Sequence, residues 1–248
     1  MKNKIFIIVA ASILSLFLSY NIMAQEKTYF DSPFGVGGGF VASWTLPNIQ
    51  PVNDQLKTFG TPELAKSGYF SSGGAGFVYI GFVPGLRIGG IGFSGSTSES
   101  ELSGGFRRQA KLTSAFGGVS VEYTLPRFIR HAGISIGVIL GGGNTTLEFY
   151  RYKDSYSWDQ LWNEIKDSTS TSNFGRKLSN DYFVVAPTLN IDIPMYRLIA
   201  FRFGATYAIH VGNNWKLDNE QDVYNVPTAT AKGQLYLNAG IFFGFFSF

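Results

Sequence analysis

The sequence predicts an all-β fold: an eight-stranded antiparallel up-and-down transmembrane β-barrel. Three observations predict it. Apolar residues alternate with polar or small ones in eight stretches, the connections between these stretches alternate between long and short, and the last residue is phenylalanine. A strand that crosses a membrane hides one face in lipid, and closure of the barrel satisfies every backbone hydrogen-bonding group. The pattern therefore indicates how the chain is built, and it identifies no ligand or reaction.

The composition limits the classes of protein that fit. Of the 248 residues, 45% are hydrophobic and 16% are aromatic, yet after the first two dozen residues no apolar run is long enough for a helical span. Thirty glycines and 23 phenylalanines suit strands that curve and face lipid. The lack of cysteine excludes disulfides and thiolate metal sites. The formal charge of only +3 gives no indication of a nucleic-acid partner. We also expect no cofactor.

The amino terminus has the three parts of a secretory signal peptide. Lys2 and Lys4 form the basic region, residues 5–18 the apolar region, and residues 22–24 a cleavage site. The polar residues 19–21 argue against an uncleaved membrane anchor. We therefore expect residues 1–24 to be removed and residues 25–248 to form one barrel domain.

The eight strands follow from period-2 alternation, and most exceed the roughly 9–11 residues that a tilted strand needs to cross a bilayer. Strands four to seven alternate clearly, whereas the faces of strands two and three are ambiguous because these strands are rich in glycine. Pro187 stands in the middle of strand six, where it donates no ladder hydrogen bond, so we expect a bulge there. The predicted strands are 35–46, 74–83, 86–94, 112–125, 133–148, 182–193, 199–212 and 233–247.

The carboxyl end, residues 242–248, has the sequence FFGFFSF. This segment resembles the terminal signal of outer-membrane barrels, and the whole layout resembles the small eight-stranded barrels of the outer membrane protein A transmembrane-domain type. The resemblance covers residues 33–248 and ends at the barrel, without a periplasmic domain. It implies location in the outer membrane of a Gram-negative-type envelope, contact with membrane lipid, and recognition by the barrel-insertion machinery. The residues that it assigns to the signal are Phe242, Phe246 and Phe248.

The connections predict the orientation of the barrel. Long connections follow strands one, three, five and seven, and short ones follow strands two, four and six. In outer-membrane barrels the long loops face outside and the short turns face the periplasm. Because the number of strands is even, both mature termini would lie on the periplasmic side. The alternative is a secreted lipocalin-like barrel with its apolar face inward, which explains neither the asymmetry of the loops nor the aromatic carboxyl end.

Two groups of side chains are predicted to face the lumen. The first is a set of charged or titratable residues: Arg87, Glu122, Asp192, Arg202 and His210. We interpret this set mainly as a structural plug of paired ions. The second is an apolar set on strand eight: Leu235, Leu237, Ile241, Phe243 and Phe245. These side chains either fill the space beside interior glycines or leave a cavity for a hydrophobic molecule. We expect no metal site.

The third long loop contains the spacing of a short amphipathic helix, with Ser157 as its cap. The residues with this spacing are Trp158, Leu161, Trp162 and Ile165. We expect the helix to lie on the rim of the barrel, as a lid, a partner surface or a lipid contact. A second helix is expected around residues 54–59.

Three functional hypotheses result. The first is a non-enzymatic barrel with a structural or surface-interaction role, whose loops contact a surface or envelope partner. The second is a protein that binds or transports small hydrophobic molecules in its lumen. The third is an outer-leaflet lipid-modifying enzyme, which rests almost wholly on His210. The oligomeric state does not follow from the sequence.

Overall fold

The structure, a computed structural model, describes residues 35–125, 132–153, 157–166, 173–196, 198–227 and 233–245, without the side chains of residues 161, 164 and 165. The expected signal peptide and the terminal residues Phe246 and Phe248 lie outside the described residues. No helix among the described residues is long and apolar enough to cross a membrane.

Eight long strands form a closed antiparallel ring, which confirms the predicted fold class. Neighbouring strands pair in chain order from β1 to β7, and β9 closes the ring between β7 and β1. A two-residue strand, β8 (Gln221–Asp222), pairs only with β7. The ring strands are β1 (Val36–Leu46), β2 (Tyr69–Tyr79), β3 (Leu86–Ser103), β4 (Phe106–Thr124), β5 (Gly133–Lys153), β6 (Phe174–Tyr196), β7 (Ile199–Leu217) and β9 (Gln234–Phe245).

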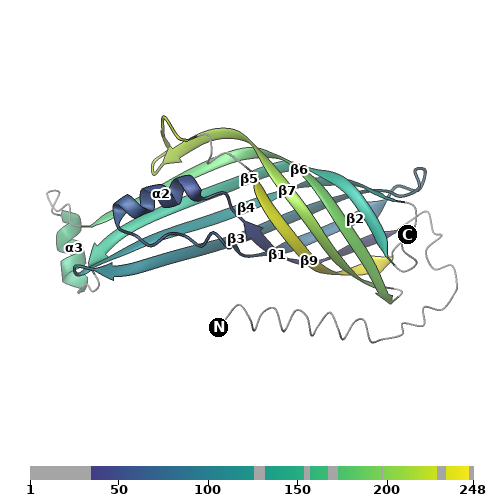
Figure 1. The fold of residues 1–248 in the computed structure, drawn as a ribbon, viewed down its shortest axis with the longest axis horizontal. Helices are drawn as coiled ribbons and strands as arrows, with labels where there is room; N and C mark the ends of the chain where they lie inside the picture. The colour runs from purple at the N-terminus through teal and green to yellow at the C-terminus, as the bar shows by residue number, and fades with distance from the viewer. Residues whose placement is uncertain are drawn as a thin grey trace.

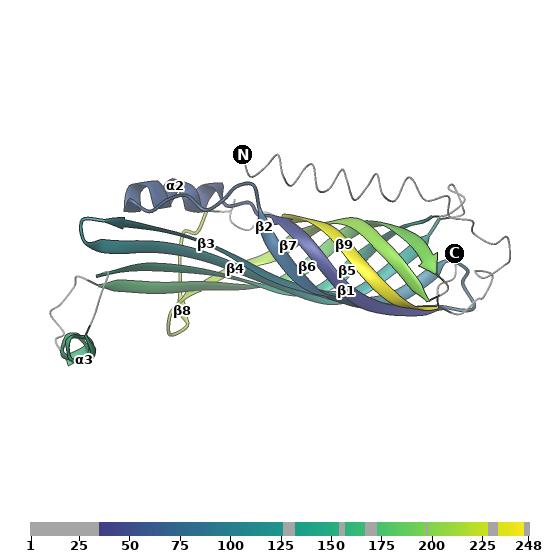
Figure 2. The same cartoon turned by 90° about the horizontal axis from the view of Figure 1, so that it is seen from below.

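Part of the sheet continues well beyond the ring, as the view in Figure 2 shows. We call this part the extension, and it comprises residues 96–113, 146–153 and 174–179 of β3 to β6. The prediction of a loop at 95–111 was wrong: β3 and β4 stay paired up to a two-residue turn at Gly104 and Gly105. Both glycines have positive φ, at 60° and 77°, as the type I′ hairpin turn requires.

Two other strand details differ from the prediction. Strand β2 begins and ends earlier than the expected 74–83. The register between β6 and β7 is the same on both sides of Pro187, so there is no bulge at that residue. The two irregularities lie instead at Tyr182, opposite Gly212 and Asn213, and between Pro194 and Tyr196. Gly212 has a φ of 121°, which favours glycine because it has no Cβ.

The outward face of the ring is a band of large apolar side chains. On β5 the outward residues from Ile134 to Leu140 are aliphatic, and polar residues begin at Asn144. Outward residues on β7, including Phe203, Tyr207 and Ile209, are likewise exposed. A closed barrel with an apolar outer band is the arrangement of a membrane-spanning β-barrel, since lipid covers the band and closure leaves no unpaired edge.

The interior contains two apolar clusters at different heights. The lumen core lies inside the ring and includes Val41, Phe77, Phe93, Phe116, Ile139, Tyr182, Val184, Tyr236 and Phe242. The mouth core lies at the base of the extension and consists of Ile49, Leu56, Leu64, Tyr69, Ala110, Leu112, Leu147 and Trp215. Helix α2 (Gln50–Phe59) lies against the extension in Figure 1 and supplies part of the mouth core.

Candidate functional site

Four of the predicted lumen charges meet in one group, which we call the ion cluster. Arg87 is paired with Glu122 across β3 and β4, and Asp192 with Arg202 across β6 and β7. Arg87 Nε donates to Glu122 Oε2 at 2.8 Å and Arg87 Nη1 to Asp192 Oδ2 at 2.7 Å, while Arg202 Nε donates to Asp192 Oδ1 at 2.6 Å. The four side chains are at most 7% exposed. The cluster thus joins four strands across the lumen.

Aromatic rings pack against the ion cluster. The guanidinium carbons of Arg87 and Arg202 lie 4.8 and 4.7 Å from the centre of the Phe77 ring, and that of Arg202 lies 4.6 Å from the Phe242 ring. Such cation–π contacts strengthen when they are desolvated. Asn190 Nδ2 also donates to Glu122 at 3.3 Å. Each charge in the cluster therefore has partners, as a buried charge requires.

His210 lies apart from the ion cluster, although the sequence grouped it there. Its ring stacks on Tyr182 with centroids 3.9 Å apart. The Tyr182 hydroxyl is hydrogen-bonded to Thr145 at 3.0 Å, and His210 Nε2 has no hydrogen-bond partner among the described residues. The geometry therefore gives His210 a stacking partner and gives its Nε2 no hydrogen bond among the described residues, whereas a general base is oriented through hydrogen bonds to its ring nitrogens.

An aromatic stack fills the lumen above the ion cluster. The ring centroids of Phe93 and Tyr236 are 5.7 Å apart, and those of Phe116 and Tyr236 are 5.2 Å apart. Phe77 and Phe242 follow below, at 5.9 Å. An eight-stranded lumen is only wide enough for side chains to fill it. These rings occupy the cross-section where a hydrophobic ligand would have to lie.

The predicted apolar lumen face of strand eight was wrong. The structure places all five of its residues on the outward side of β9: Leu235, Leu237, Ile241, Phe243 and Phe245. The inward residues are Gln234, Tyr236, Asn238 and Phe242. Phe242, assigned to the terminal assembly signal, is thus buried in the lumen rather than lipid-facing. The outward positions of this strand are all apolar, whereas the inward ones include Gln234 and Asn238. With the apolar face toward lipid, period-2 alternation therefore indicates the observed facing.

A layer of hydrogen-bonded polar side chains separates the lumen core from the mouth core. Thr45 and Ser71 hydroxyls are 2.7 Å apart, and the Tyr69 hydroxyl is hydrogen-bonded to Ser114. Ser114 Oγ donates across the lumen to Gln234 Oε1 at 3.5 Å, and the Tyr236 hydroxyl on the same strand as Gln234 donates to that oxygen at 3.2 Å. The sequence analysis did not identify this layer, because Ser and Thr at inward positions give no motif.

Residues 47–68, which we call loop 1, cover the mouth of the barrel. Leu56 and Leu64 are almost completely buried. The Asn53 side chain holds the loop closed, since its Nδ2 donates to the Leu64 carbonyl and its Oδ1 accepts from the Leu64 N–H, both at 3.0 Å. Arg108 Nη1 donates to the Gly60 carbonyl at 3.3 Å, at the end of α2. Loop 1 is therefore an ordered plug over the mouth core.

Ion pairs on the outer side of loop 1 involve Glu63. Its carboxylate lies 2.9 Å from Lys66 Nζ and 3.1 Å from Lys57 Nζ. Hydrogen bonds from Lys66 and then Lys57 lower the pKa of Glu63 below its ordinary value. The group is exposed, so its effect on stability is small.

The helix predicted in the third long loop is present as α3 (Trp158–Lys166). Ser157 Oγ accepts from the Gln160 N–H, and Gln160 Oε1 accepts from the Ser157 N–H, which makes a capping box. Trp158 and Trp162 are 72% and 45% exposed; the side chains of Leu161 and Ile165 lie outside the described residues. Figure 1 places α3 beyond the end of the extension rather than on the rim of the barrel.

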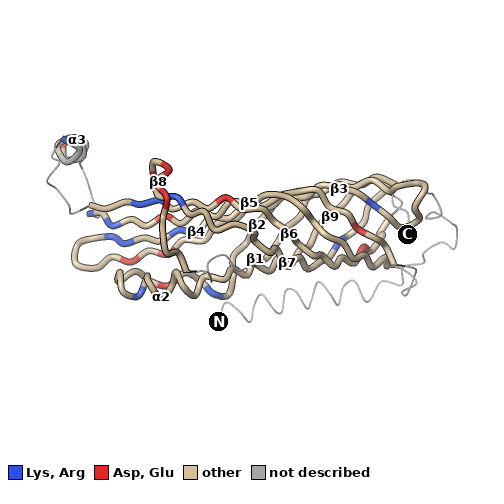
Figure 3. Tube along the Cα trace, turned by 90° about the horizontal axis from the view of Figure 1, so that it is seen from above, with Lys and Arg blue, Asp and Glu red and all other residues tan. Residues whose placement is uncertain are grey.

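Charged residues of the extension form a second population, separate from the ion cluster. Figure 3 shows them along the extension and loops, with few along the ring. The described residues contain no group of three or more histidine or acidic side chains arranged to hold a metal ion.

The sequence matches no protein-family model and no curated protein. Among solved structures, the chain is similar to a major outer membrane protein from Thermus thermophilus, with a TM-score of 0.48, 8% identity, and coverage of 85% of this chain and 99% of that one. It is also similar to Neisserial surface protein A, with a TM-score of 0.42, 12% identity, and coverage of 86% and 97%. A third similar structure is Ail, the attachment invasion locus protein of Yersinia pestis, with a TM-score of 0.36, 14% identity, and coverage of 86% of this chain and 97% of that one.

Proposed function

We propose that the chain is a non-enzymatic integral outer-membrane protein with a structural or surface-interaction role, and that its working surface is the extension with loop 1 and α3. The observation that carries the proposal is the contrast between a lumen filled by the ion cluster and the aromatic stack and an extension that has its own buried core. A filled lumen offers no passage, whereas an ordered surface far from the bilayer is suited to contacts.

In the proposed orientation the extension lies outside the cell. The short turn at residues 80–85, the start of β1 and the end of β9 all lie at the opposite end of the ring, so both mature termini would be periplasmic. We further propose that the barrel-insertion machinery reads the terminal aromatic residue, Phe248.

The exposed tryptophans of α3 support a contact surface. Trp158 and Trp162 meet edge to face with ring centroids 5.5 Å apart, while most of the Trp158 side chain remains exposed. Tryptophan is enriched at the centres of interfaces and is uncommon on surfaces that have no partner. The partner that we propose is a surface polymer or another envelope component.

Orientation is tested with an epitope tag on intact cells. A tag between Gly104 and Gly105 should bind antibody without permeabilisation, and a tag beside Phe82 only after the outer membrane is opened. The surface-interaction role is tested by measuring how proteoliposomes that contain the protein bind to immobilised envelope polysaccharide. The double variant Trp158→Ala/Trp162→Ala should lose binding, and the lumen variant Phe93→Leu should keep it. Loss of binding in the lumen variant alone would overturn the proposal.

A further inference from the structure

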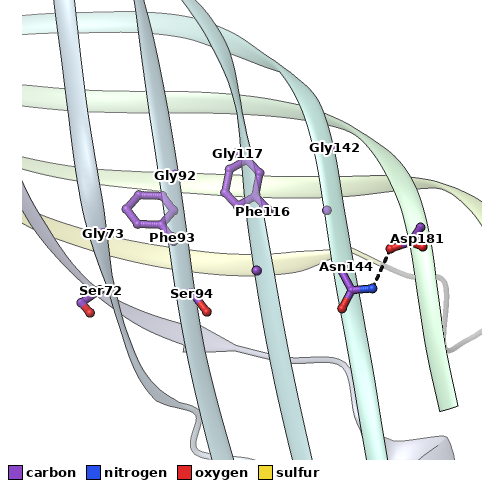
Figure 4. Close-up of a pocket in the computed structure, with 12 residues that line it drawn as sticks. Ser72, Gly73, Gly92, Phe93, Ser94, Phe116, Gly117, Gly142, Asn144 and Asp181 are labelled. Atoms are coloured by element: carbon purple, nitrogen blue, oxygen red, sulfur yellow. Dashed lines mark hydrogen bonds between the residues drawn. The ribbon is translucent and has the colours of Figure 1, made fainter. Parts of the chain in front are cut away.

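The extension leaves one edge of its sheet without a strand partner. Strand β3 pairs with β2 up to Gly95, and below that point the two strands lie side by side, with Ser72 of β2 beside Ser94 of β3 (Figure 4). Over residues 96–103, β3 continues with β4 as its only strand partner in the described part of the chain. We call the side of residues 96–103 that faces away from β4 the free edge.

The register identifies the main-chain groups at the free edge. The Ile80 N–H donates to the Leu86 carbonyl on the β2 side, and the Thr124 N–H donates to the Gly85 carbonyl on the β4 side. The main-chain groups of successive residues point to opposite sides of a strand, and the pairing of β3 shows no register shift. Even-numbered residues therefore point their N–H and C=O groups at the free edge. These residues are all exposed: Ser96, Ser98, Ser100 and Leu102.

The opposite edge of the extension is closed, in contrast. Strand β7 covers β6 up to Leu178, which is paired with Leu217. Beyond that pair, the Asp218 N–H donates to the Lys177 carbonyl and the Lys177 N–H donates to Asp218 Oδ1, both at 2.8 Å. Proteins usually cover an edge in this way, or blunt it with lysine, proline or a bulge, because unpaired strands recruit other chains. The free edge has none of these three devices.

Two acidic side chains lie along the free edge. Glu99 is paired with the buried Ala110 of β4, and Glu101 is paired with Arg108. Neither glutamate forms an ion pair with a described residue, since Arg108 Nη1 donates to the Gly60 carbonyl at 3.3 Å. A strand added at the free edge would lie about 5 Å from β3 and about 10 Å from β4. The two glutamates are therefore the charges nearest to an added strand.

The other basic residues of this region lie on strands farther from the free edge. Arg107 is on β4, paired with Leu102, and Arg151 is on β5, paired with Arg108. Their strands are at least about two strand spacings, or 10 Å, from an added strand, a distance at which salt largely screens exposed charges. The glutamates thus favour a partner strand with positive charge.

A second copy of this chain is a poor partner for the free edge. Pairing of Ser98 with Ser100 of the other copy would place Glu99 opposite Glu99, and pairing of Ser100 with Ser100 would place Glu99 opposite Glu101. Like charges directly opposite each other destabilise a sheet. Antiparallel pairing of two copies of β3 would also point the two barrels in opposite directions, which does not suit two proteins in one membrane.

We propose that the free edge binds an extended segment of another protein as an additional antiparallel strand, with basic side chains two residues apart opposite Glu99 and Glu101. Main-chain hydrogen bonds with Ser98 and Ser100 supply affinity, and the glutamates supply specificity. In this pairing both glutamates occupy non-hydrogen-bonded positions, where side chains on neighbouring strands approach most closely. This inference goes beyond the proposed function and does not depend on α3 or on its contact with a surface polymer.

The probe is a fluorescent peptide in which lysine and threonine alternate, and the control peptide has the same composition with its lysines in one block. Fluorescence anisotropy measures their binding to the purified protein in detergent micelles. The wild type should bind the alternating peptide at least about tenfold more tightly, because only alternation places the lysines on one face of a strand. Equal binding of the two peptides, or no binding of either, would overturn the proposal.

The main-chain contribution is tested with Ser98→Pro/Ser100→Pro. These substitutions remove two N–H groups at the free edge and leave the ladder between β3 and β4 intact, because both groups point away from β4. Affinity for the alternating peptide should fall at least about tenfold. The matched control, Ser98→Ala/Ser100→Ala, keeps both N–H groups and should bind as the wild type does. Folding of each variant is checked by electrophoretic mobility before and after heating, and equal binding by the two folded variants would contradict the proposal.

The charge contribution is tested with Glu99→Lys/Glu101→Lys, which should prefer a peptide in which glutamate and threonine alternate. Hydrogen exchange gives a second readout on the wild type. The alternating lysine peptide should slow exchange of the Ser98 and Ser100 amides and leave those of Glu99 and Glu101, which point at β4, unchanged. A preference that is not reversed in the charge variant, or unchanged exchange at Ser98 and Ser100, would rule out strand addition at the free edge.

Discussion

The ion cluster illustrates how single residues determine the interior of this barrel. Arg87 contacts acidic residues from two different strands, Glu122 on β4 and Asp192 on β6. Arg202 contacts the same two carboxylates, so the four charges balance within one contact network. Loss of one cation would leave a buried carboxylate without compensation, which costs far more than an exposed ion pair contributes.

We therefore expect Arg87→Met to destabilise the barrel by about 3–5 kcal/mol. Lys111→Met, which breaks the exposed pair with Glu148, should change stability by less than about 1 kcal/mol. The measurement is equilibrium urea unfolding of both variants in phospholipid vesicles. Similar losses in the two variants would contradict the view that the ion cluster is buried and tightly coupled.

Glu63 provides a residue-level prediction about pH. Because Lys66 and Lys57 lower its pKa, the carboxylate stabilises loop 1 at neutral pH, and this contribution is lost as the pH falls through the lowered pKa. Carboxyl NMR titration should find a value below 4.5, the ordinary value for Glu. Lys57→Gln/Lys66→Gln should raise it toward 4.5. An unchanged pKa in that variant would rule out the lysines as the cause.

At the scale of elements, alternation in the sequence predicted the strands because lipid on one side imposes a period of two. This held for β5 and β7, where large apolar residues occupy nearly every outward position of the ring and only a few inward ones, such as Ile139. It did not predict the extension, since there both faces contain Ser, Thr and charged residues, and pairing is held by backbone hydrogen bonds and by the turn at Gly104 and Gly105.

Strand β9 was predicted with the wrong facing, although its alternation indicates the observed one. Its outward positions from Leu235 to Phe245 are all apolar, whereas its inward positions include Gln234 and Asn238. What the sequence does not show is the set of contacts made by the two inward rings: Tyr236 packs against Phe93 and Phe116, and Phe242 lies under Arg202. Contacts such as those of Tyr236 join residues more than a hundred positions apart, and a local pattern does not contain them. Glu122, Asp192 and Arg202 could be placed inward because each lies on a strand whose other face is clearly apolar. Arg87 lies on a glycine-rich strand whose faces the alternation left ambiguous.

Adjacent glycines on β5 should respond differently to substitution. A Cβ at the inward Gly141 would lie 2.0 Å from the Gly117 carbonyl oxygen, whereas one at the outward Gly142 is 3.9 Å from its nearest neighbour. We expect Gly141→Ala to lower the unfolding free energy by more than about 3 kcal/mol and Gly142→Ala to change it by less than about 1 kcal/mol. Refolding yield and urea unfolding in vesicles measure both. If both variants are equally stable, then β5 at Gly141 lies farther from β4 at Gly117 than the structure shows.

Loop 1 should detach from the mouth when Asn53 loses its amide. Asn53→Leu leaves the Leu64 N–H and carbonyl without their partners, at a cost of about 1–3 kcal/mol for each buried group. Limited proteolysis should then cut loop 1 while the ring stays folded. Thr58→Ala, which removes a hydrogen bond from an exposed residue of the same helix, is the control. A protease-resistant loop in Asn53→Leu would show that the mouth core alone holds loop 1.

At the scale of the whole molecule, three barriers follow one another along the barrel axis. Loop 1 and the mouth core lie at one end, the aromatic stack in the middle, and the ion cluster toward the other end. Each is built from side chains of several strands that meet inside the barrel. We therefore expect the lumen to be closed at three levels, with the extension, loop 1 and α3 at one end of the barrel.

Barriers in series make a specific prediction for conductance, because ions must pass all three. In planar bilayers the wild type should lack openings of porin size, and so should Asn53→Leu and Phe116→Ala/Tyr236→Ala, since each leaves at least one barrier intact. Combining these substitutions still leaves the ion cluster, whose paired charges offer a permeating ion no free ligand. Conductance should appear only when Arg202→Ser is added to the combined variant. Large openings in the wild type, or in any variant that keeps the ion cluster, would show that the lumen contains a path that these side chains do not block.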